Sequence, residues 1–145
     1  MRLNVQTDFA LRVLMRLAMT PENLVTIETI ATEYGISRNH LMKVAHLLGR
    51  LGYIETLRGR TGGLRLKGDP ASIRIGEVVR QIEPDFHLVE CFEANRNRCR
   101  ISPACSLRLI LGEALAGFIA ILNQHTLADL MTNRHILADL IGVEA

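Results

Sequence analysis

Two short amphipathic runs separated by one glycine constrain the fold of this chain more than any other feature. Residues 26–34 form the first run, and Gly35 ends it. Ser37 is a good N-cap for the second run, because its hydroxyl accepts a hydrogen bond from a free backbone N–H group. Apolar residues then recur at the spacing of one helix face, at Leu41, Val44, Ala45 and Leu48. A helix, a glycine-containing turn and a second helix form the layout of a helix-turn-helix unit.

Polar residues gather at the start of the second helix, outside its apolar stripe. With the capping Ser37 they are Arg38, Asn39, His40 and Lys43. This part of a recognition helix carries the contacts to base edges and phosphates. The alternative at this point is an ordinary pair of amphipathic helices with a solvated polar face.

A glycine-rich hairpin after the second helix favours DNA binding over that alternative. Residues 53–57 and 64–66 are short strand candidates. The connection RGRTGG places Arg58, Arg60 and Thr61 at a tight tip, from which they reach phosphates or a minor groove. A nucleotide-binding loop is not expected, because no Gly-Lys-Ser/Thr and no strand-to-helix context are present. The hairpin is therefore predicted to be the wing of a winged helix.

Helices are predicted on both sides of this unit. Thr7 is a candidate N-cap for a helix that runs to about Met19, with Asp8 in the first turn, where the helix dipole favours an anion. Its buried stripe is predicted to be Leu11, Leu14, Met15 and Ala18. A further short helix is predicted to pack on the core through Ile75, Val78, Val79 and Ile82.

Charge is distributed unevenly although the net charge is only +2. Residues 36–68 hold seven Lys or Arg against one acid, Glu55, whereas the region after residue 105 is mildly acidic. This asymmetry favours one polyanion-binding part. No Ser/His/Asp set, paired carboxylates or nucleotide loop is present, so an enzyme is not expected. Asp8, Arg12 and Arg16 interrupt any secretory core, so a cytoplasmic protein is expected.

Residues 106–124 are apolar on nearly every side of a predicted helix. Such a helix is buried or spans a membrane. Arg108 and Glu113 lie within it, and charge at bilayer depth is costly, so burial against a second copy is expected and no membrane. A two-fold dimer also provides two recognition helices on one face of double-stranded DNA. The second apolar pattern of residues 126–145 is expected to fold onto the partner.

All three cysteines lie between residues 91 and 105, in the spacing C-x7-C-x5-C. In a reducing compartment such a group is more often metal-binding or redox-active than a disulfide framework. The long gaps suit an iron–sulfur cluster better than a zinc knuckle. Zinc with His87 or another fourth ligand, a thiol redox switch and structural cysteines remain open from spacing alone.

The chain resembles the iron–sulfur winged-helix repressors, and most of all their nitric-oxide-sensing members. The resemblance covers nearly the whole chain and rests on QTDFALRVLMRLA, GISRNHLMKV, LRGRTGGLRL, IRIGEVVRQIEP, LVECF, CRISPAC and HTLADL. It implies a homodimer with one cluster per subunit, 4Fe-4S more than 2Fe-2S, held by Cys91, Cys99 and Cys105. In the nitric-oxide sensors a carboxylate at the position of Asp8 reaches across from the other subunit to complete the coordination. An oxygen-exposed preparation is expected to lack the cluster.

The resemblance also implies the mechanism and the domain boundaries. The dimer is expected to repress from a palindromic operator while the cluster is intact and to release it when nitric oxide nitrosylates or removes the cluster. Residues 1–84 are expected to form a winged helix-turn-helix domain, residues 85–105 the cluster-binding loop, and residues 106–145 the dimerisation helix and tail. The fold class is mainly α with a small β wing.

Two relatives limit this interpretation. The iron–sulfur assembly regulators of the family have a histidine ligand just after the third cysteine, but Ser106, Leu107 and Arg108 follow here. The rhizobial iron regulators resemble the ECFE segment and have similar cysteine spacing without the early carboxylate. An iron- or redox-responsive regulator of the same fold, including a zinc or thiol sensor, is therefore the alternative.

Overall fold

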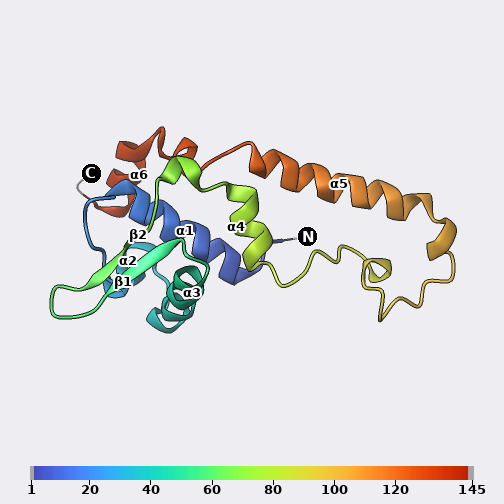
Figure 1. Cartoon of the computed structure of the whole chain (residues 1–145), viewed down its shortest axis with the longest axis horizontal. Coiled ribbons are helices and arrows are strands. Elements are labelled where there is room, and N and C mark those ends of the chain that lie inside the picture. Colours follow the sequence, from blue (N-terminus) through green and yellow to red (C-terminus); the bar gives the residue numbers. More distant parts are fainter. Residues whose placement is uncertain (1, 144–145) are drawn as a thin grey trace.

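The computed structural model describes residues 2–143 as a winged helix-turn-helix domain from which a loop and a long helix project (Figure 1). The α-helices are α1 (Val5–Met19), α2 (Ile27–Tyr34), α3 (Arg38–Arg50), α4 (Ile75–Ile82), α5 (Ser106–Asn123) and α6 (Arg134–Ile141). Strands β1 (Ile54–Leu57) and β2 (Gly63–Leu66) form the wing. Single 3₁₀ turns lie at Pro70–Ser72, Glu90–Phe92, Ser102–Ala104 and Asp129–Met131. The predicted fold class, mainly α with a small β wing, is confirmed.

Helix α1 passes through the core, but it begins earlier than predicted. Its N-cap is Asn4, whose side-chain oxygen accepts from the backbone N–H of Gln6 at 2.9 Å. The prediction of Thr7 as N-cap is therefore wrong: Thr7 lies inside the helix, fully buried. Asp8 does lie in the first turn, as expected. Within the predicted stripe, Leu14 and Ala18 are buried and Leu11 and Met15 half-buried, because α1 is covered on more than one side.

The helix-turn-helix forms as the local pattern predicts. Gly35 ends α2 with φ of +63°, a left-handed conformation that glycine adopts without steric cost. Ser37 caps α3 by accepting from the backbone N–H of His40 at 3.3 Å. The four predicted apolar positions of α3 are all buried, and so are the four of α4.

The wing is a two-stranded antiparallel sheet in which Ile54 pairs with Leu66 and Leu57 with Gly63. Ile54, Leu64 and Leu66 point into the core, which anchors the hairpin to the domain. At the tip, a Cβ on Gly62 would lie 2.3 Å from the carbonyl oxygen of Leu57. Only glycine fits there, so the turn itself requires the first glycine of the Gly62–Gly63 pair.

Helix α5 is exposed along most of its length in the single chain. Of its residues only Ile119 is buried, while Leu107, Leu109, Ile110 and Ile121 are each about 60% or more exposed. By length and composition alone α5 is the one helix among the described residues that could cross a membrane. Figure 1 shows the loop of residues 83–105 and α5 extending together away from the winged domain.

The first part of the tail packs on its own domain, whereas contact of its later apolar residues with a partner stays a prediction, because Ile136 and Leu140 are exposed in the single chain. The backbone N–H of Leu127 donates to the carbonyl of Ile73 at 2.8 Å, and Leu127 is fully buried. Leu130 and Met131 also pack against the core. The segment after α5 packs there because the start of α4 has apolar side chains and backbone groups that need partners. Leu127 donates to Ile73, and Ile75 donates to His125. Residues 144–145 of the predicted tail lie outside the described residues.

Helices α4 and α5 meet at a close approach. A Cβ on Gly76 would lie 2.2 Å from Oδ1 of Asn123, the last residue of α5. Arg74 donates from Nη1 to the Asn123 carbonyl at 2.7 Å, and the Asn123 amide donates to Glu77 at 3.3 Å. The C-terminal end of α5 is therefore fixed to the winged domain.

Candidate nucleic-acid interface and cysteine loop

The start of α3 presents the predicted recognition residues to solvent. Ser37, Arg38, Asn39, His40 and Lys43 are all exposed, because the buried stripe holds the opposite side of the helix against the core. Sequence reasoning missed Met42, which lies on this exposed face and is 44% exposed. The sequence pattern that could have identified Met42 is an apolar residue that lies outside the buried stripe of α3.

Two of these side chains already have neighbours within the chain. Nε of Arg38 lies 3.7 Å from Oε2 of Glu28 on α2, and both side chains are about 70% exposed. An exposed pair of this kind is weak and easily exchanged for a phosphate. The His40 ring lies against Phe9 of α1, with ring centroids 6.0 Å apart. Arg38 is therefore free to change partner, whereas His40 is held at the side of the helix.

The wing supplies a second positively charged element. Arg58, Arg60 and Thr61 at its tip are exposed, as predicted. On the strands behind the tip, Arg65 and Glu55 pair with each other at 2.5 Å, so that basic charge is partly neutralised. The unneutralised charge is concentrated at the tip, where it reaches furthest from the domain.

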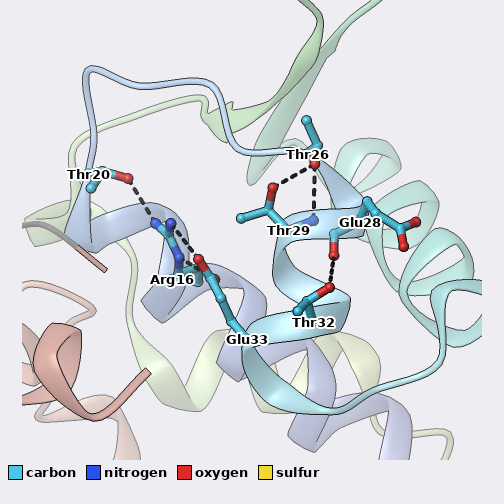
Figure 2. Close-up of polar contacts among 7 residues, drawn as sticks. All are labelled: Arg16, Thr20, Thr26, Glu28, Thr29, Thr32 and Glu33. Atoms are coloured by element: carbon cyan, nitrogen blue, oxygen red, sulfur yellow. Dashed lines mark hydrogen bonds and ion pairs between the residues drawn. The ribbon is translucent and has the colours of Figure 1, made fainter. Parts of the chain in front are cut away.

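A buried ion pair fixes α2 against α1 behind this surface (Figure 2). The Arg16 guanidinium donates from Nε and Nη2 to both oxygens of Glu33, at 2.6 and 3.0 Å. Its Nη1 also donates to the Thr20 hydroxyl at 2.9 Å. The neighbouring Tyr34 phenol has a pKa raised by burial, although the Arg16 charge opposes that shift. This network sets the position of α2, and through Gly35 that of α3.

The three cysteines lie on the loop between α4 and α5. Cys91, Cys99 and Cys105 are free thiols, each half-buried. Asn97 organises the loop: it accepts from the Cys99 N–H and donates to the Ser102 hydroxyl, each at 3.0 Å. Cys105 immediately precedes α5.

Within residues 2–143 no three His, Cys, Asp or Glu side chains gather closely enough to hold a metal ion. His87, a candidate fourth ligand in the zinc alternative, lies beside Asp85, with Nδ1 3.7 Å from Oδ1. The donor set itself suits iron–sulfur ligation, since three unpaired thiols are accessible on one loop. The structure leaves the assignment of Cys91, Cys99, Cys105 and Asp8 as ligands a prediction.

Asp8 is paired with Arg12 on the next turn of α1, with Oδ2 2.9 Å from Nη2. Both side chains are about 45% exposed, so the pair is weak and does not prevent Asp8 from binding another partner. The cysteine-bearing part of the loop lies away from α1 in the single chain (Figure 1). The start of the loop is tied to the start of α1, because the Asn4 N–H donates to Glu83 at 2.8 Å.

The capped recognition helix, the exposed basic wing tip and the supporting core together define a winged helix-turn-helix DNA-binding protein. The chain belongs to the Rrf2 family, described as iron-dependent transcriptional regulators, whose model matches residues 3–133. It is therefore a transcriptional regulator and not an enzyme, as predicted. Membership of the family implies that the protein binds an iron–sulfur cluster. A soluble transcriptional regulator acts on DNA, which implies that the protein is located in the cytoplasm.

Several curated relatives of similar length have the same name. The chain is 53% identical over 145 residues to the HTH-type transcriptional regulator NsrR of Bacillus subtilis (strain 168), covering 99% of each protein. It is 49% identical over 143 residues to the regulator of that name from Bacillus licheniformis, covering 98% of this chain and 100% of the relative. The fold is similar to that of CymR (YrzC), the global cysteine regulator of Bacillus subtilis, with a TM-score of 0.73 at 22% identity, over 92% of this chain and 98% of that one.

Proposed function

We propose that this protein is a homodimeric repressor that senses nitric oxide through an iron–sulfur cluster and releases its operator when the cluster is lost. The observation that carries the proposal is the position of the cysteine loop. It is inserted directly between α4, which packs in the DNA-binding domain, and α5, most of which is exposed. A change in the shape of this loop therefore moves the N-terminal end of α5, because the other end is fixed to the domain through Asn123.

The dimer is supported by the exposed apolar surface of α5. Four large aliphatic side chains along this helix are exposed in the single chain. A patch of this kind on a DNA-binding regulator favours a protein partner over water. A second copy related by a two-fold axis also places two recognition helices to face successive major grooves of a palindromic operator. Two α5 helices packed together satisfy both requirements.

The ligands we propose are Cys91, Cys99 and Cys105 of one subunit, with Asp8 of the partner subunit as the fourth. The cluster proposed is 4Fe-4S. When bound, such a cluster supplies iron that nitric oxide attacks, most readily where a weak oxygen donor leaves the metal accessible. The three half-buried thiols would hold the loop in one shape by binding the same cluster. Asp8 has only its exposed pairing with Arg12 to give up.

Loss of the cluster would free Asp8, and this change would reach the DNA-binding surface through α1. Asp8 is on the first turn of α1, and Arg16 of the same helix fixes α2 through Glu33. A shift of α1 therefore changes the placement of α3 relative to the recognition helix of the partner. A dimer whose two recognition helices no longer match the half-site spacing loses affinity.

The experiment is an anaerobic titration with nitric oxide that follows visible absorbance and operator binding in the same sample. We expect a coloured protein that binds one duplex tightly and loses both colour and affinity together. Cys99→Ser should abolish the colour, whereas Asp8→Ala should retain a spectrally altered cluster. Protein that remains colourless after anaerobic reconstitution with iron and sulfide contradicts the proposal and favours a zinc or thiol sensor.

A further inference from the structure

Met42 is the only large apolar side chain on the exposed face of α3, and it is 44% exposed. The stripe of this helix that packs in the core is complete without it, because Leu41, Val44, Ala45 and Leu48 are all buried. Met42 therefore adds little to the stability of the isolated domain. Its side chain lies on the surface that meets DNA.

The neighbours of Met42 on α3 narrow the set of residues that are available for base contacts. Arg38 suits a phosphate contact, because its weak pair with Glu28 is easily exchanged for a phosphate, and the His40 ring lies beside Phe9. Within residues 2–143, the side chains of Asn39, Met42 and Lys43 make no hydrogen bond or ion pair. These three lie within one helical turn of one another and point away from the core.

We propose that Met42 determines part of the sequence specificity by contacting the 5-methyl group of a thymine in the major groove. That methyl group is the one apolar feature of the major-groove edge of a base pair, and it is the partner of an apolar side chain there. The flexible thioether of methionine adapts to its position. The inference deepens the proposed DNA-binding function and does not depend on how the signal is sensed.

The spacing along α3 places this contact next to one from Asn39. Residues three apart lie on the same side of a helix, and the rise between them is about 4.5 Å. Successive bases on one strand are about 3.4 Å apart. Asn39 offers the amide that pairs with the major-groove edge of adenine. The two side chains therefore fit two adjacent A·T base pairs. Asn39 recognises the adenine of one pair, and Met42 contacts the thymine of the other.

The test compares thymine with uracil, which differs only by the methyl group. Duplexes selected from a random double-stranded library by the anaerobically reconstituted dimer are resynthesised with deoxyuridine replacing each thymine in turn. Affinities of wild type and Met42→Ala are measured on every duplex at one salt concentration. Loss of one buried methyl contact should weaken wild-type binding about fourfold at one thymine of each half-site.

Met42→Ala should bind the thymine duplex about fourfold more weakly per half-site and should no longer distinguish thymine from uracil at that position. Met42→Leu, which retains an apolar side chain, should keep the discrimination. Lys43→Ala, the matched control one residue along, should weaken binding on all duplexes equally. Circular dichroism checks that each variant retains its helices.

The proposal is overturned if wild type ignores the methyl group at every thymine, or if Met42→Ala discriminates as wild type does. Failure of the nitric oxide response with intact methyl discrimination rejects the sensing function alone. Loss of the Met42 dependence with an intact nitric oxide response rejects this inference alone. The two results are therefore distinguishable in the same preparation.

Discussion

Arg16 and Glu33 join the first two helices through two parallel hydrogen bonds, at 2.6 and 3.0 Å, in a site where both side chains are nearly buried. Figure 2 shows the guanidinium between Glu33 and Thr20. Bidentate pairing of this kind fixes orientation as well as distance. The pair therefore determines how α2, and the turn leading to α3, sits on the helix that carries Asp8.

Removing one partner of this pair should be costly. Glu33→Ala leaves the Arg16 charge buried without its carboxylate, and we expect a loss of about 3 kcal/mol in the free energy of unfolding. Urea denaturation measures it. Arg80→Ala, which breaks an exposed pair with Glu77, is the control and should change stability by less than about 1 kcal/mol. Equal effects of the two variants would show that burial does not strengthen the first pair.

The wing tip should contribute to DNA affinity mainly through phosphates. Replacing Arg58 and Arg60 together with alanine should reduce the slope of log affinity against log salt by about 2 per subunit, because two fewer counterions are released. Fluorescence anisotropy across a salt series measures this slope. Arg134→Ala on α6, which lies on another side of the domain (Figure 1), is the control. An unchanged slope in the double variant would exclude the wing from the interface.

Asn39 and Lys43 should differ in what they contribute. Asn39→Ala should weaken binding and also relax the preference among related sites, because an amide recognises a base edge. Lys43→Ala should lower affinity by a similar factor on every site. Competition binding with a set of single-base operator variants separates the two. The assignment is wrong if the two alanine variants give the same ranking of sites.

The contact between Gly76 and Asn123 should not tolerate a methyl group. Gly76→Ala places a Cβ about 2.2 Å from Asn123 Oδ1 and should destabilise the protein by about 1–3 kcal/mol. Gly49→Ala on α3, where nothing lies within 4 Å of the added atom, should instead stabilise the helix by up to about 1 kcal/mol. Thermal unfolding distinguishes them. Asn123→Ala in the Gly76→Ala background should recover only part of the loss, because the backbone nitrogen of residue 123 still lies 2.9 Å from the added Cβ.

The turn before the last helix should stabilise the protein in a pH-dependent way. The backbone N–H and hydroxyl of Thr126 donate to Asp129, and these hydrogen bonds lower the pKa of the carboxyl from its ordinary 3.8. A lowered pKa means that the stabilisation is present above pH 3.8 and is lost as the pH falls through the folded-state value. Asp129→Asn should therefore be less stable than wild type at pH 7. The difference should vanish under acid conditions, and Thr126→Val should show part of it.

Local chemistry in the sequence determined the DNA-binding unit. The stripe of α3, its Ser37 cap, the left-handed Gly35 and the glycine-rich wing tip all depend on residues a few positions apart, so periodicity and turn preferences predict them. The start of α1 differs from the prediction because Asn4 and Thr7 are both residue types that cap helices, and only packing decides between them. Thr7 is fully buried in the core, and the exposed Asn4 caps the helix.

Contacts between distant parts of the chain were decided by the tertiary structure alone. The Arg16–Glu33 pair, the Gly76–Asn123 approach and the docking of Leu127 beside Ile73 join residues 17, 47 and 54 positions apart. No local pattern encodes them, because each depends on how whole elements pack. The cysteines show the same division: their spacing and residue type predict a ligand set, whereas only the fold shows that their loop and α5 extend away from the winged domain.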